Sequence, residues 1–271
     1  MANAKELTVI IGGNGKTGGR VAQRLRGMGR PVRLASRSTA IPFDWNDESS
    51  WQPALADARA LYMTYYPDLA LPGAAQQVEG VCAVASQCGV EKIVLLAGRG
   101  EPQVHRAENA VRSCGIDSTI LECAFFADNF TEGVLAPVGG AVTFCAGDIR
   151  EPFICCDDIA DVATLALSEE GHRGKTYELT GPEAISFAEA TRLLGLGMGK
   201  PLEYVQMSLT EYGHVLAPHM PPPVVDFFLD LFGFLLDGHN AYTTSEVEQL
   251  LGRPARSFEQ FVQTSVRNSA A

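Results

Sequence analysis

The chain predicts an α/β fold, in which a doubly wound parallel sheet is followed by a smaller, mostly helical C-terminal lobe. Short apolar or β-branched runs alternate with helical patterns over the first half, and a glycine-rich turn joins the first run to the first helix. The alternation loosens after about residue 135. We therefore expect a sheet-forming domain over residues 1–150 and a lobe over 151–271, some of whose strands and helices return to the core.

The strands of the first half are short apolar runs bounded by turn residues. The first helix follows the first strand, because Val21, Leu25 and Met28 recur at helical spacing before Gly29 and Pro31 end it. A second helix is expected over 74–88. The five predicted strands are 7–11, 31–36, 60–65, 92–97 and 118–124.

Later elements are marked by local signals. "DDIADVATLAL" predicts a helix and "KTYELTG" predicts a strand. Capping boxes at Ser186 with Glu189 and at Ser257 with Gln260 predict two helix starts. The apolar run "VVDFFLDLFGFLL", residues 224–236, is too short to span a membrane and predicts a helix that either covers a cleft or pairs in a dimer.

Composition excludes several classes of protein. The chain has 271 residues, 46% of them hydrophobic, and a net charge of −11 with scattered basic residues, so a nucleic-acid partner is not expected. No signal-like segment begins the chain, which predicts a cytoplasmic protein. Seven cysteines without CxxC spacing are expected to be reduced core residues, and no cluster predicts a metal site. These cysteines are Cys82, Cys88, Cys114, Cys123, Cys145, Cys155 and Cys156.

The turn "GGNGKTGG" predicts a dinucleotide site. It places Gly12, Gly15 and Gly18 directly after a buried strand and at the start of a helix. Glycines let backbone amides approach a pyrophosphate closely, and the helix N-terminus adds partial positive charge.

The end of the second predicted strand indicates which dinucleotide binds. NAD sites usually carry an acidic residue there, whereas this chain has Arg37 between Ser36 and Ser38. An arginine with two hydroxyls favours the 2′-phosphate of NADP. Asp44, in "PFDW", is a candidate acceptor for the adenine amine.

The chain resembles the NmrA-like branch of the atypical short-chain dehydrogenases over almost its whole length. The resemblance rests on this turn and on the segments "SRS", "PFDW", "ENAVRSCGIDSTILECAFFADNF" and "DDIADVATLAL". Within that branch, "RSTAIPFDWNDESSWQPALADARALYM" is similar to reductases related to agroclavine dehydrogenase. The resemblance implies a Rossmann-type NADP(H) domain and a C-terminal substrate lobe, with the substrate between them. It also implies that Asn14, Lys16 and Thr17 line the dinucleotide with the three glycines and Arg37, and that residues 62–66 and Phe125 lie near the nicotinamide. The predicted cofactor set is completed by Gly13, Ser36, Ser38, Asp44, Thr64, Tyr65 and Ala97.

Departures from the family pattern bear on the chemistry. Glu122 and Cys123 stand where the family often has arginine and proline, and no lysine falls on the helix after "KIVLLA". No tyrosine is followed by lysine four residues later, so the usual Tyr-x-x-x-Lys proton donor is missing. Because hydride transfer to a simple ketone needs such a donor, this absence favours delocalised or cationic acceptors.

His105 is the one residue of the expected catalytic region with an ordinary pKa near neutrality. It is either a general acid or a surface residue. Glu108 is expected to pair with Arg112 on the same helix. His214 and His219 either contact substrate or lie on the surface of the C-terminal lobe.

Aromatic residues predict the substrate slot. Tyr66 follows the third strand, Phe126 follows the fifth, and Phe227 and Phe228 lie on the apolar C-terminal helix. Such rings either line a hydrophobic slot for a flat molecule or pack in the core.

The sequence thus predicts an NADPH-dependent oxidoreductase that reduces a bulky conjugated or aromatic metabolite of the quinone, iminium or enone type, in secondary metabolism. The alternatives are a non-catalytic NADP(H) sensor and a redox-neutral cyclase or isomerase on the same fold. The expected partner is a small hydrophobic molecule, without membrane association, and the protein is expected to be a monomer or a homodimer.

Overall fold

The computed structural model describes residues 6–269, with side chains described through residue 265. The chain forms two compact units. One contains the chain up to Cys123 together with Cys156–Leu179, and the other contains Ala124–Cys155 and the chain from Thr180 onward.

The first unit is built on a six-stranded sheet in the order β2-β1-β3-β4-β5-β8, and all neighbouring strands are parallel. Every residue of β1 and of β3 is buried. Helices cover both faces of a doubly wound sheet, which is why its central strands are continuous apolar runs rather than alternating ones. The strands are β1 (Thr8–Ile11), β2 (Val32–Ala35), β3 (Ala60–Met63), β4 (Lys92–Gly98), β5 (Asp117–Cys123) and β8 (Lys175–Leu179).

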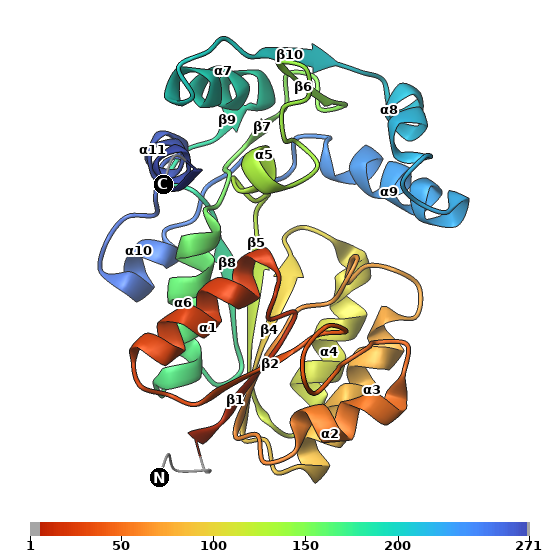
Figure 1. Cartoon of the computed structure of the whole chain (residues 1–271), viewed down its shortest axis with the longest axis vertical. Helices are drawn as coiled ribbons and strands as arrows, with labels where there is room; N and C mark the ends of the chain where they lie inside the picture. The colour runs from red at the N-terminus through yellow and green to blue at the C-terminus, as the bar shows by residue number, and fades with distance from the viewer. Residues whose placement is uncertain (1–5, 270–271) are drawn as a thin grey trace. The chain divides into compact units, whose positions relative to one another are not determined.

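Two groups of helices cover this sheet. Helices α1 and α6 pack together on one face, and α2, α3 and α4 lie on the other (Figure 1). The helices of this unit are α1 (Lys16–Gly27), α2 (Trp51–Leu55), α3 (Ala74–Gln87), α4 (His105–Ser113) and α6 (Cys156–Ser168), with short 3₁₀ turns at Glu48–Ser50 and Pro102–Val104. The predicted doubly wound parallel sheet is confirmed.

The division of the chain differs from the expected boundary at residue 150. The predicted strand in "KTYELTG" forms β8, which pairs with β5 from Thr119↔Lys175 to Cys123↔Leu179. Helix α6 packs on α1, where Arg24 donates hydrogen bonds to the carboxylates of Asp157 and Asp161. The chain therefore leaves the first unit after Cys123 and returns to it at Cys156, so each unit consists of two separate segments of the sequence.

The second unit is mostly helical and has an aromatic core. Phe130, Phe144 and Phe187 are fully buried, and Phe153 packs edge-on against Phe187 with ring centroids 4.9 Å apart. Its helices are α5 (Asn129–Glu132), α7 (Phe187–Gly197), α8 (Leu209–Leu216), α9 (Pro222–Leu235), α10 (Glu246–Leu251) and α11 (Phe258–Ser269). Its strands form two pairs, β6 (Ala141–Phe144) with β10 (Glu203–Gln206) and β7 (Arg150–Glu151) with β9 (Ile185–Ser186).

The predicted helix caps are only partly realised. Ser257 and Gln260 form a reciprocal capping box. At Ser186 the hydroxyl accepts from the Glu189 amide, but the Glu189 carboxylate pairs with Arg192 instead of returning to the cap. The predicted hydrogen bond from the Ser186 amide to the Glu189 carboxylate is therefore wrong, because Arg192 competes for that carboxylate.

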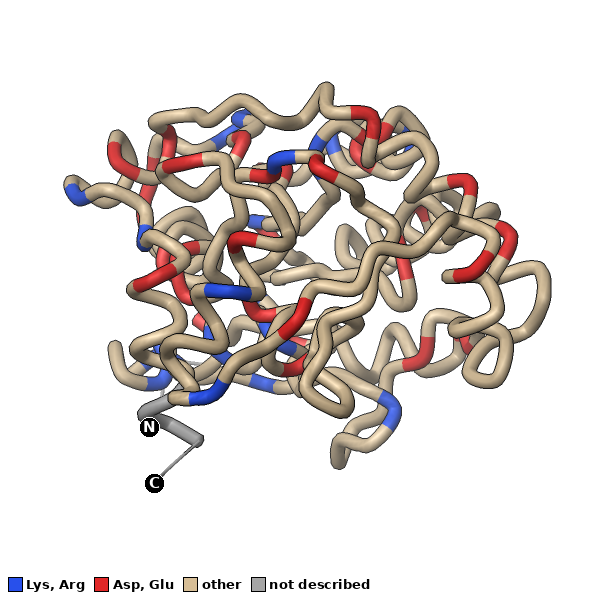
Figure 2. Tube along the Cα trace, turned by 90° about the horizontal axis from the view of Figure 1, so that it is seen from above, with Lys and Arg blue, Asp and Glu red and all other residues tan. Residues whose placement is uncertain are grey.

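Cysteines and charges complete the fold. All seven cysteines are free; Cys88, Cys114 and Cys145 are only half-buried, whereas the other four are buried as predicted. Among the described residues no helix is long and apolar enough to cross a membrane. Lysine and arginine are scattered along the trace among acidic residues (Figure 2).

Candidate functional site

The glycine-rich turn after β1 forms a cradle that side chains would fill. Gly12 has φ +75°, and a Cβ placed on it would lie 2.0 Å from Thr64 Oγ1. A Cβ on Gly18 would lie 2.3 Å from the Gly12 carbonyl oxygen, and the Gly15 amide donates to that same oxygen at 2.8 Å. A side chain at Gly12 or Gly18 would force the turn to shift, so glycine at these two positions keeps the backbone open to a ligand.

The N-terminus of α1 faces this turn without a cap of its own. Its N-cap is Gly15, no side chain caps the first turn, and that turn contains no acidic residue. An uncapped helix N-terminus with partial positive charge and no acidic neighbour in its first turn suits an anionic group, which fits the pyrophosphate of a dinucleotide. Gly13, Lys16 and Thr17 belong to the same turn and first helical residues, as the sequence predicts.

The end of β2 is tied to the glycine turn. Asn14 Nδ2 donates to Ser36 Oγ at 3.0 Å and to Ser38 Oγ at 3.1 Å. Arg37, between the two serines, is exposed and makes no ion pair or hydrogen bond with the described part of the chain. Its guanidinium is available to bind an anion beside the turn.

The loops after β2 and β3 also meet. The ring of Tyr65 lies 4.7 Å from that of Trp45, centroid to centroid, and its hydroxyl donates to Gln77 Oε1. Asp44 Oδ1 accepts from the Asn46 amide at 2.9 Å, which fixes the carboxylate in a local turn. Thr64 Oγ1 donates to the Ile11 carbonyl at 3.1 Å and so holds β3 against the glycine turn.

Other predicted residues fall elsewhere. Tyr62, inside the expected nicotinamide segment 62–66, is fully buried in β3, so its side chain does not line a ligand site. Ala97 is buried in β4, and Tyr66 is 73% exposed. His105 begins α4 on the surface and makes no hydrogen bond or ion pair within the described residues.

The predicted aromatic residues Phe125, Phe126, Phe227 and Phe228 all belong to the second unit. Phe125 packs against Phe144 and Phe187, and Phe228 stacks on Phe232 with centroids 5.8 Å apart. Phe125 and Phe228 therefore pack against the aromatic core of that unit, which for Phe228 is the predicted alternative to lining a slot.

Glu101 is a buried acid that the sequence interpretation missed. It follows β4 and is 7% exposed, and its Oε1 lies 1.9 Å from where a Cβ on Gly98 would stand. Burial, then the charges of Asp68 and Glu108, raise the pKa of Glu101 to about 8. A glycine at the end of β4 is the only local signal, because it makes room for this carboxyl group.

A second group of carboxylates lies between α4 and the sheet. Glu108 is fully buried and pairs with Arg112 at 3.2 Å, as predicted. Glu122, the departure from the family pattern, stands opposite Glu178 in the register of β5 with β8. Burial and the charges of Glu108 and Glu178 raise the pKa of Glu122 to about 7.

This shift predicts a pH-dependent stability. In the folded protein Glu122 stays protonated up to a pH of about 7. In the unfolded chain it loses its proton near its ordinary pKa of 4.5. Stability from this group is therefore full below pH 4.5 and is lost as the pH rises to about 7. Glu122→Gln should gain stability over wild type by on the order of 1 kcal/mol across that window, allowing for partial exposure. Denaturant unfolding at pH 5 and pH 8 measures the free energy of unfolding of both proteins. Glu183→Gln, at an exposed position, is the control. A difference in stability between Glu122→Gln and wild type that does not change with pH would contradict the assignment.

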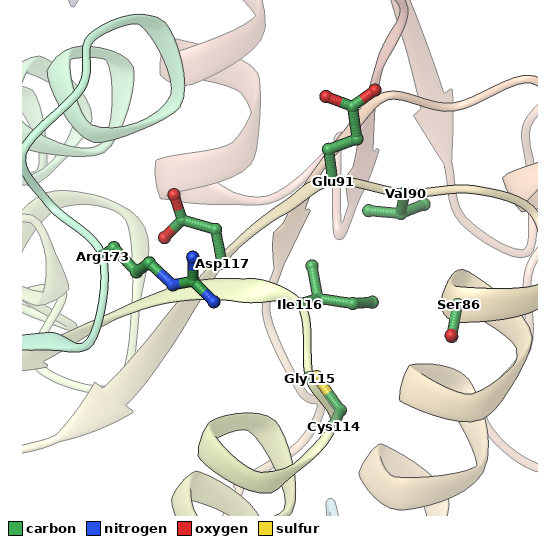
Figure 3. A pocket seen from close by; sticks show the side chains of 8 residues that line it. All are labelled: Ser86, Val90, Glu91, Cys114, Gly115, Ile116, Asp117 and Arg173. Atoms are coloured by element: carbon green, nitrogen blue, oxygen red, sulfur yellow. The ribbon is translucent and has the colours of Figure 1, made fainter.

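A separate pocket lies at the opposite edge of the sheet. Its volume is about 460 Å³, and Val90, Glu91 and Asp117 line it just before or at the starts of β4 and β5 (Figure 3). The glycine turn follows the carboxyl end of β1, so this pocket is not the dinucleotide cradle. Ligands of open α/β sheets bind outside the carboxyl ends of the strands.

Known proteins resemble the chain over nearly its full length. No family model matches it. It is 30% identical over 280 residues to (4-alkanoyl-5-oxo-2,5-dihydrofuran-3-yl)methyl phosphate reductase of Streptomyces griseus, covering 94% of this chain and 96% of that one. Agroclavine dehydrogenase of Claviceps fusiformis is 26% identical, with the same coverage of 94% and 96%.

A solved structure has the same fold. The NADPH-dependent quinone oxidoreductase of Escherichia coli, complexed with NADPH, superposes with a TM-score of 0.78 at 21% identity, covering 97% of this chain and all of that one. Together with the glycine cradle, these similarities show that the chain belongs to the NmrA-like branch of the atypical short-chain dehydrogenases/reductases and is an oxidoreductase with a Rossmann-type fold.

Proposed function

We propose that the protein is an NADPH-dependent reductase of a bulky conjugated or aromatic acceptor. The observation that supports NADPH as the cofactor is the glycine cradle beside an exposed Arg37, which makes no ion pair or hydrogen bond with the described residues. The cradle and the N-terminus of α1 would hold the pyrophosphate, and Arg37 with Ser36 and Ser38 would hold the 2′-phosphate. When bound, the reduced nicotinamide supplies a hydride.

The strand order supports the rest of the proposed cofactor site. Thr64 and Tyr65, after β3, would border the next part of the dinucleotide, and Asp44 would accept from the adenine. Ala97 and Phe125 complete the proposed cofactor set, the former through its place near the end of β4. Tyr66, Phe126, Phe227 and Phe228 are the proposed substrate residues. His105, an exposed residue, is retained only as a candidate acid whose replacement by alanine would test it.

The acceptor class is supported by two observations. The chain lacks Tyr-x-x-x-Lys, so acceptors that spread or cancel charge on reduction suit it better than simple ketones. The similar proteins are named as reductases or dehydrogenases of a furanone phosphate, a clavine and quinones. We propose a secondary metabolite of this kind as substrate, and a cytoplasmic monomer or homodimer without nucleic-acid partners.

The test is consumption of NADPH by purified protein with a panel of quinones, enones and cyclic iminium salts. Turnover with at least one class, at a rate well above that with NADH, is expected. Tight binding of NADPH and NADP⁺ alike without any turnover would instead favour a sensor. Conversion of an acceptor to an isomer without net NADPH consumption would favour a redox-neutral cyclase or isomerase.

A further inference from the structure

We propose that Glu101 is the proton donor of this reductase for those of its delocalised acceptors, such as quinones, that take up a proton after hydride transfer. The proposal rests on the proposed function and deepens it, since it names the residue that completes the reaction after hydride transfer. It also predicts which acceptors depend on that residue and which do not.

The position of Glu101 is the first argument. Its carboxyl group lies directly on Gly98, the last residue of β4, because a Cβ there would be 1.9 Å from Oε1 and 2.4 Å from Cδ. Gly100, with φ +74°, turns the chain so that Glu101 folds back over the strand end. The carboxyl group therefore stands at the carboxyl edge of the sheet, where α/β enzymes bind ligands.

The order of the strands gives the second argument. Arg37 follows β2 and the glycine cradle follows β1, so a dinucleotide would place its 2′-phosphate at β2 and its pyrophosphate at β1. The remaining half of the molecule then extends to the other side of β1, over β3 and toward β4. Glu101, at the end of β4, is thus on the nicotinamide side of the pyrophosphate.

The surroundings of Glu101 favour its protonated form. Asp68 approaches from the loop after β3, and Glu108 approaches from α4, where Arg112 offsets part of its charge. Burial raises the pKa of Asp68 as well, but the hydrogen bond that Asp68 accepts from the Ala70 amide at 2.8 Å opposes this rise, whereas the Glu101 carboxyl group accepts none from the described residues. Of two neighbouring carboxyl groups, the one without such a bond retains the proton.

Burial adds to the same effect, since the pKa of Glu101 is raised to about 8. A carboxylic acid that remains protonated at neutral pH is a suitable general acid.

Proton transfer from Glu101 would follow hydride transfer to the acceptor. Hydride supplied by a bound reduced nicotinamide would reach a carbon or oxygen of the acceptor and leave negative charge on an acceptor oxygen. The O–H bond of Glu101 would break as an O–H bond forms on that oxygen, so the acceptor gains two electrons and two protons in all, one proton within the hydride and the other from Glu101. The Glu101 carboxylate then takes a proton from water. An iminium acceptor becomes a neutral amine on receiving hydride and needs no proton.

The test compares two acceptors in wild type, Glu101→Gln and Glu79→Gln, an exposed control on α3 of the same unit. With menadione, which needs a proton, we expect Glu101→Gln to lower kcat by about 100-fold or more. With 2-methyl-3,4-dihydroisoquinolinium, which needs none, we expect little change. The control should resemble wild type with both.

The wild-type kcat for menadione should fall as the pH rises through about 8, and this fall should be absent in Glu101→Gln.

A readout independent of turnover accompanies the kinetics. Infrared spectroscopy of the protein with NADP⁺ bound should show a protonated carboxyl band at pH 7 that decreases as the pH rises through about 8 and is absent from Glu101→Gln. A similar loss with both acceptors, or no loss with menadione, would overturn the assignment of Glu101 while leaving the reductase intact. If wild type consumes NADPH with neither acceptor nor any other member of the panel, the proposed function fails and the donor role fails with it.

Discussion

Replacing Gly18 with alanine is expected to abolish tight NADPH binding and to destabilise the first unit. The new Cβ would lie 2.3 Å from the Gly12 carbonyl oxygen and 2.9 Å from its carbon, both backbone atoms that no side-chain rotation can move. The turn must open to admit the methyl group, and overpacking of this kind costs about 1–3 kcal/mol. Thermal unfolding and a fluorescence titration with NADPH measure the two effects.

Gly19 offers a matched control in the same helix. A Cβ there would meet only the Gly13 carbonyl oxygen at 3.5 Å, an ordinary contact. Gly19→Ala should therefore keep its affinity for NADPH and unfold at the same temperature or slightly higher, since alanine favours helix over glycine by up to about 1 kcal/mol. Equal effects of the two substitutions would contradict the cradle geometry.

Replacing Arg37 with alanine is expected to remove most of the preference for NADPH. A charge-assisted hydrogen bond contributes about 1.5–3 kcal/mol, so the dissociation constant for NADPH should rise by about 10- to 100-fold. NADH has no 2′-phosphate, and its affinity should change little. Calorimetric titration of both dinucleotides measures the difference.

The control for this substitution is Arg26→Ala. Arg26 is exposed in the last turn of α1 and makes no ion pair or hydrogen bond with the described residues. Its loss should leave both affinities unchanged, apart from the small effect of net charge. Similar losses of NADPH and NADH affinity in Arg37→Ala would exclude a contact with the 2′-phosphate.

Much of the sheet could be predicted because its strands are locally distinct. Buried parallel strands are continuous apolar runs, and the predicted 92–97 and 118–124 lie within one residue of β4 (Lys92–Gly98) and β5 (Asp117–Cys123). The division into units could not be predicted in the same way. The chain returns to the first unit when α6 packs against α1 and β8 pairs with β5, and the contact of α6 with α1 joins segments more than a hundred residues apart that leave no local pattern.

The site shows the same contrast. The turn from Gly12 to Gly18 is visible in the sequence because its function requires residue types at fixed spacing. Glu101 precedes a proline in a polar turn and reads as a surface residue. Its carboxyl group fits over Gly98 because that residue has no side chain, and the charge of Asp68, in another loop, helps to raise its pKa, so only the folded chain reveals it.

The most direct test of the reductase proposal is the fate of the hydride. Wild-type protein would be incubated under anaerobic conditions with NADPH deuterated at C4 of the nicotinamide and with the best iminium acceptor of the panel, and the product would be examined by mass spectrometry and NMR. The account predicts one deuterium on the iminium carbon, transferred from one face of the nicotinamide only. A product without deuterium, or unchanged NADPH with every acceptor despite tight binding, would contradict it.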